Sequence, residues 1–72
     1  MRTRIRLDTL SDVKRFVDIT TKVPEKVTLE DGSGYCVSAQ SLLGAMASME
    51  WDRIYCYCNH DIYTKISDFV LG

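Results

Sequence analysis

The sequence has no long hydrophobic run, little proline and glycine, and no excess of one charge. No apolar stretch approaches the roughly 18 residues that span a bilayer, and the first residues lack the apolar segment and cleavage site of a secretory signal. The net charge is −1 with basic residues spread along the chain, which gives no dense cationic face for a nucleic-acid backbone. We therefore expect a cytoplasmic protein that binds neither nucleic acid nor membrane.

Cysteine and histidine are also scarce: the chain has three cysteines and one histidine. Three cysteines cannot all pair within one chain, so reduced thiols are expected and stability must come from the core. One proline and four glycines, with 46% hydrophobic residues, exclude collagen-like, low-complexity and disordered chains. The sequence predicts a single globular domain over 1–72.

Hydrophobic periodicity predicts seven elements along the chain. Thr9 with Asp12 approximates a capping box, and a Gly-rich turn over 31–34 joins two strands of a hairpin. The expected strands are 3–7, 26–30, 35–39 and 53–59, and the expected helices run from Thr9 or Ser11 to before Pro24, from about Ser41, and from 61 to about 71. This order, β-α-β-β-α-β-α, predicts an α+β open-faced sandwich, a four-stranded antiparallel sheet with helices on one face.

A C-x-C-x-H pattern, formed by Cys56, Cys58 and His60, raises the question of a metal site. Strand alternation places both thiols on the core face and Cys36 on the outward face of its own strand, which leaves a zinc ion short of a fourth ligand. Because free cysteine is commonly buried, we interpret Cys56 and Cys58 as core residues and expect no metal.

The outward face of the predicted sheet carries Tyr55 and Tyr57 among basic side chains such as Arg4 and Arg6. Such a face can stack on nucleobases, but pairing of tyrosine with long basic side chains across strands explains it without a ligand. A dimer contact through this face would have the same sequence pattern. The chain also has no phosphate-binding glycine loop and no nucleophile with a base in reach, so we expect neither enzyme activity nor a cofactor.

The element order, with the segment Ala39–Met46, "AQSLLGAM", resembles HPr, the histidine phosphocarrier of the bacterial sugar phosphotransferase system. Its most specific part, Ser41 to Met46, is similar to the Ser-apolar-apolar-Gly-apolar-Met segment of HPr from low-GC Gram-positive bacteria. The resemblance implies the HPr-like fold over most of the chain. After Met46 the match is loose, and Trp51 has no counterpart in it.

The resemblance also implies where the carrier histidine would stand, about seven residues before the pair Phe16-Val17. Thr9 occupies that position, Ser11 the position of the family's arginine, and Asp12 that of its proline. A phosphothreonine ester is too stable for rapid phosphoryl relay, and the guanidinium that would bind phosphoryl oxygens is missing. We therefore expect carrier chemistry to be lost, and His60 to lie at the other end of the sheet in a polar loop.

Ser41 has two interpretations. As a helix N-cap, its hydroxyl accepts a backbone N–H bond worth about 1 kcal/mol. The resemblance adds that a dedicated kinase phosphorylates the serine at this place in HPr, after which the protein binds a transcription regulator. A phosphoryl group suits a helix N-terminus electrostatically.

Leu42, Leu43 and Met46 follow Ser41 on a helix too short to bury all three. In HPr the corresponding residues dock partner proteins; alternatively they close the core over the sheet. We expect an HPr-like regulatory or protein-binding module whose partner is a phosphotransferase-system protein, HPr kinase or a transcription regulator. The alternatives are a phosphocarrier with atypical chemistry and a purely structural interaction module.

Overall fold

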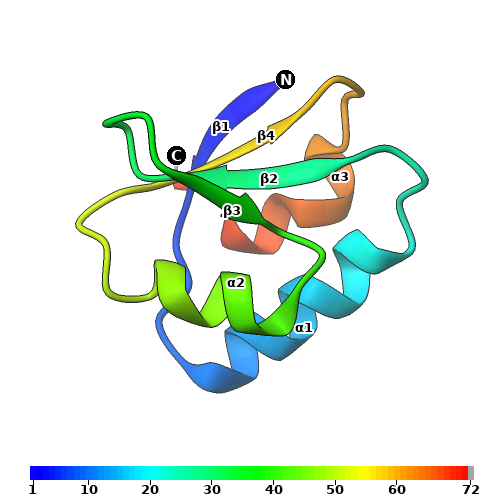
Figure 1. The fold of residues 1–72 in the computed structure, drawn as a ribbon. Helices are drawn as coiled ribbons and strands as arrows, with labels where there is room; N and C mark the ends of the chain where they lie inside the picture. The colour runs from blue at the N-terminus through cyan, green and yellow to red at the C-terminus, as the bar shows by residue number, and fades with distance from the viewer. Residues whose placement is uncertain (72) are drawn as a thin grey trace.

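The computed structural model describes residues 1–71 and has two layers, a four-stranded antiparallel sheet and a layer of helices on one of its faces (Figure 1). The strands lie in the order β1-β4-β2-β3, so β4 is inserted between the first strand and the hairpin. The element order is β1 (Arg2–Ile5), α1 (Leu10–Thr21), β2 (Val27–Glu30), β3 (Cys36–Ser38), α2 (Leu42–Ser48), β4 (Ile54–Cys58), α3 (Tyr63–Ile66) and the 3₁₀ helix η1 (Ser67–Phe69). The predicted α+β class with an open antiparallel sheet is confirmed.

Strand alternation sorts the side chains of the sheet as predicted. Cys56 and Cys58 have no exposed surface, whereas Tyr57 and Cys36 on the other face are exposed. The pairing of β1 with β4 sets Arg4 opposite Tyr55, and the Arg2 guanidinium lies 4.1 Å from the centre of the Tyr55 ring. Cross-strand pairs of arginine and tyrosine therefore account for the outward tyrosines.

The first helix begins at the predicted cap. The Thr9 hydroxyl accepts a hydrogen bond from the Asp12 N–H at 3.1 Å, and the Asp12 carboxylate accepts one from the Thr9 N–H at 3.3 Å, which completes a capping box. Val13, Phe16 and Thr20 turn the buried face of α1 toward the sheet. Thr9, rather than Ser11, is thus the N-cap.

The last helix is shorter than predicted. A helix to about residue 71 is wrong: α3 ends at Ile66, η1 follows, and Val70 forms a bridge with Ile5. The Arg6 N–H donates to the Phe69 carbonyl at 2.8 Å, so the chain after η1 pairs with the free edge of β1. Pairing with that edge satisfies backbone groups that a continued helix would leave without a partner on β1.

Candidate functional site

The helix α2 has an unusual distribution of side chains, with small residues inward and large apolar residues outward. Its buried residues are Ala45 and Ser48, whereas Leu42, Leu43 and Met46 are 41%, 79% and 38% exposed. We call these three exposed side chains the α2 patch. A surface helix normally buries its large apolar side chains, so α2 has the reverse of the usual arrangement.

Gly44 explains why small residues face the sheet. A Cβ atom added to Gly44 would lie 2.8 Å from the Ser38 carbonyl oxygen, closer than a Cβ normally approaches backbone. The helix therefore rests directly on the end of β3, and the contact leaves no room for a larger side chain at this position. This close approach turns the remaining large residues of the helix to solvent.

Ser41 caps α2. Its hydroxyl accepts a hydrogen bond from the Gly44 N–H at 3.3 Å, and its carbonyl accepts the first helical bond, from the Ala45 N–H at 2.9 Å. The side chain is partly exposed and lies next to the α2 patch in sequence. Capping therefore leaves the Ser41 hydroxyl within reach of solvent.

The residue before this cap holds the loop in place, a role that the sequence pattern did not reveal. The Gln40 amide nitrogen lies 2.9 Å from the Thr20 carbonyl, 3.1 Å from that of Val23 and 2.9 Å from that of Glu25. Beside it, the Thr20 hydroxyl donates to the Ala39 carbonyl at 2.8 Å. These bonds fasten the entry of α2 to the C-terminal end of α1, and so they fix the position of the cap.

The region around Thr9 is acidic and already paired. The Asp12 carboxylate accepts N–H bonds from Asp8 and Thr9, and its other oxygen lies 3.6 Å from Arg15. Asp8 forms an ion pair with Arg6 at 2.8 Å. The first turn of α1 thus already holds a carboxylate where a phosphoryl group would need the N–H groups.

The structure does not bring the two sequence-predicted sites together. Thr9 precedes the first residue of α1, whereas Ser41 follows the Ala39–Gln40 segment that is bonded to the last turn of α1 (Figure 1). Ser11 is exposed on the first turn of α1. His60 is exposed in the loop after β4, with Nδ1 3.8 Å from a Glu25 carboxylate oxygen. The histidine and Thr9 therefore belong to opposite ends of the sheet, as predicted.

The cysteines belong to the core and the outer face rather than to a shared site. Burial raises the pKa of the Cys56 thiol to about 12, and the neighbouring Cys58 thiol acts in the same direction. Within residues 1–71 no three side chains of the kinds that bind metals are grouped to hold an ion. In the same part of the chain no helix has the length and apolar character needed to cross a bilayer.

Comparison with known proteins found no matching family model, no matching curated protein and no matching solved structure.

Proposed function

We propose that this protein is an HPr-like cytoplasmic module without carrier chemistry that regulates or binds a protein of the sugar phosphotransferase system through the α2 patch. The carrying observation is the outward placement of Leu42, Leu43 and Met46 on a helix whose inward positions are small. Apolar side chains that remain exposed beside a capped helix end are suited to docking a partner protein.

The HPr-like fold is supported by the order of the elements and by the position of β4. The chain runs β-α-β-β-α-β-α before η1, and β4 pairs antiparallel with β1, the arrangement expected from the resemblance. Residues of the "AQSLLGAM" segment also have defined local roles. Gln40 bonds the entry of α2 to the end of α1, Ser41 is the N-cap of α2, and Gly44 lies against the end of β3. These contacts give a physical reason for three residues of the segment that carries the resemblance.

Loss of carrier chemistry is supported by the surroundings of Thr9. Its hydroxyl is engaged in a capping box, and carboxylates of Asp8 and Asp12 lie around the first turn of α1. A phosphoryl group at Thr9 would meet these like charges and would form a stable ester.

Ser41 is the proposed regulatory position. A phosphoryl group there would add about −2 charge beside the α2 patch, at a helix N-terminus with free N–H groups to receive it. The modification would convert an apolar docking surface into one with a charged edge, and it would select a different partner without unfolding the domain.

The carrier prediction is tested by incubation with enzyme I and labelled phosphoenolpyruvate. We expect no acid-labile phosphate on the protein. A His60→Gln variant serves as the control that identifies the acceptor, because His60 is the one histidine in the chain. Acid-labile label that disappears in this variant would show a relocated carrier histidine and would overturn the proposal.

The regulatory prediction is tested with HPr kinase and ATP, followed by mass spectrometry of peptides. We expect one phosphoryl group on Ser41 and none on a Ser41→Ala variant. Ser33, an exposed serine in the β2–β3 turn, provides the matched control, since Ser33→Ala should leave the modification unchanged. Absence of label, or label that persists in Ser41→Ala, contradicts the regulatory role.

A further inference from the structure

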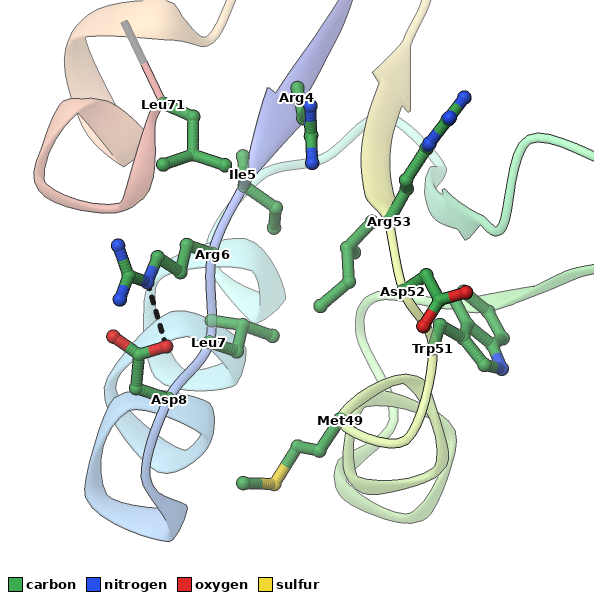
Figure 2. Close-up of a pocket in the computed structure, with 11 residues that line it drawn as sticks. Arg4, Ile5, Arg6, Leu7, Asp8, Met49, Trp51, Asp52, Arg53 and Leu71 are labelled. Carbon is green, nitrogen blue, oxygen red and sulfur yellow. Dashed lines mark hydrogen bonds and ion pairs between the residues drawn. The ribbon is translucent and has the colours of Figure 1, made fainter.

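A cleft of about 310 Å³ lies where β1 and β4 separate, beyond the pairing of Ile5 with Ile54. One wall is the segment from Arg4 to Asp8, and the other runs from Met49 at the end of α2 to Ile54 (Figure 2). The α2 patch does not contribute to this cleft, since its lining residues on that side begin at Met49. The cleft is therefore separate from the α2 patch.

The floor of the cleft is apolar. Ile5, Leu7 and Ile54 are almost fully buried, and Figure 2 shows Ile5 and Leu7 pointing from the first wall toward the second. Met49 points back across the gap from the end of α2, and Trp51 stands on the second wall. Trp51 is held there by an edge-to-face contact with Tyr35, the ring centres being 5.8 Å apart. These side chains form the apolar part of a lining that also contains five charged residues, so the cleft is suited to a ligand with both an apolar and a charged group.

The rim of the cleft is cationic. Arg4 lies opposite Tyr55 on the outward face, and Arg53 precedes buried Ile54, so alternation puts both guanidiniums on the same face of the sheet. Arg6, the third arginine of the lining, is neutralised by Asp8 at 2.8 Å. Within residues 1–71, neither Arg4 nor Arg53 forms an ion pair with a carboxylate. Asp52 lies on the same wall as Arg53, so the charged residues of the lining, three arginines and two aspartates, leave the cleft with a net charge of +1 that favours an anion.

We propose that this cleft binds an organic phosphate monoester, with its dianion between the guanidiniums of Arg4 and Arg53 and its apolar group on the floor near Trp51. Two guanidinium groups on one face of the sheet can each bind two phosphate oxygens, and their combined charge exceeds that of Asp52 in the same lining. In Figure 2 the Arg4 guanidinium is turned toward the cleft and that of Arg53 away from it. Binding therefore includes rotation of the exposed Arg53 side chain, which occurs within nanoseconds.

The negative charge of Asp52 disfavours binding of an anion in the cleft. It lines the cleft beside Trp51, and its carboxylate is on the same wall as Arg53. Removing its charge with Asp52→Asn should strengthen binding, whereas removing the charge of Arg4 or Arg53 should weaken it. Opposite changes in affinity from neighbouring positions distinguish electrostatic recognition of an anion from nonspecific hydrophobic binding in the cleft.

The test is titration of the protein with phenyl phosphate, followed by the fluorescence of Trp51, the single tryptophan. We expect a saturable change with a dissociation constant of about 1 mM or tighter. Inorganic phosphate and benzyl alcohol, which carry only the anion or only the ring, should bind at least about tenfold more weakly. Equal binding of phenyl phosphate and benzyl alcohol, or no saturable change, overturns the proposal.

The variants Arg4→Gln and Arg53→Gln should each weaken phenyl phosphate binding about tenfold, the loss of one charge-assisted pair. Arg2→Gln is the matched control, because Arg2 lies on the same strand and face but outside the cleft, paired with Glu30 at 3.2 Å. Unchanged binding in both test variants, or an equal loss in Arg2→Gln, contradicts the assignment. Thermal melting of each variant confirms that the protein compared is folded.

Discussion

Replacing Gln40 with glutamate tests whether the bonds at the entry of α2 hold the candidate site in place. The substitution keeps the shape of the side chain but replaces an N–H donor with an oxygen. That oxygen would face the carbonyls of Thr20, Val23 and Glu25, which the amide nitrogen approaches at 2.9 to 3.1 Å. The other oxygen would still accept from the Val27 N–H, a bond of 3.4 Å in the parent protein.

An amide nitrogen has two hydrogens, so the substitution removes two full hydrogen bonds and leaves carbonyls facing a like partial charge. At roughly 1 kcal/mol for each bond, the free energy of unfolding should fall by about 2–3 kcal/mol once repulsion is included. For a domain of this size, a loss of about 2–3 kcal/mol should lower the melting temperature by about 8–24 °C at neutral pH.

The assay is thermal melting followed by circular dichroism, with Asn59→Asp as the matched control. That substitution makes the same chemical change, but Asn59 accepts a bond from the Tyr57 hydroxyl at 2.6 Å, which a carboxylate also accepts. The control should change stability by less than about 0.5 kcal/mol. Equal losses in the two variants would show that the added negative charge, and not the lost bonds of Gln40, causes the effect.

Acid should rescue the Gln40→Glu variant. The three carbonyls favour the protonated acid, which donates a hydrogen bond, so folding raises the pKa of the new carboxyl. A raised pKa means that the folded state retains the proton longer, and the variant loses stability as pH rises through that range. The difference in melting temperature between the Gln40→Glu variant and the parent protein should therefore become smaller on acidification.

Three further predictions concern neighbouring features. Gly44→Ala should lower the free energy of unfolding by about 1–3 kcal/mol in chemical denaturation, because the clash with the Ser38 carbonyl outweighs the better helix propensity of alanine. A more stable variant would contradict the close packing of α2 on β3. Iodoacetamide should modify exposed Cys36 in the folded protein, whereas buried Cys56 should react only on unfolding. Burial raises the pKa of the Cys56 thiol to about 12, so the free energy of unfolding should fall as pH rises above about 9, where the thiol ionises in the unfolded chain. Hydrogen bonds from the Ser33 N–H and hydroxyl and from the Tyr35 N–H lower the pKa of Asp31, so the stabilisation that they give is lost on acidification. Asp31→Asn should therefore reduce the dependence of the free energy of unfolding on pH in acid, and an unchanged pH dependence would contradict this.

Local signals accounted for most of the fold. The capping box at Thr9, the alternation through Cys56 and Cys58, and the Gly-rich turn each depend on residues near in sequence, so they can be recognised from the amino-acid sequence alone. Gly32 and Gly34 have φ values of 88° and 107°, which explains why glycine stands in that turn. Elements set by near neighbours are therefore the ones that sequence patterns predict.

Features set by distant neighbours were missed. The end of α3 depends on pairing with the edge of β1, more than sixty residues away in the sequence. The anchoring by Gln40 and the position of Trp51 depend in the same way on α1 and on Tyr35. For the candidate site, Ser41 and the apolar residues after it were predicted, but their outward orientation follows from the contact of Gly44 with β3.

The proposed function depends above all on the docking of a phosphotransferase-system partner against the α2 patch. The decisive measurement is the amide chemical-shift map of the labelled protein titrated with HPr kinase, repeated with Leu43→Ser, which removes the most exposed residue of the patch. We predict shifts confined to α2 and the adjoining turns, and binding weakened about tenfold or more by the substitution. Shifts elsewhere on the molecule, binding unaffected by Leu43→Ser, or no binding would contradict the proposed docking.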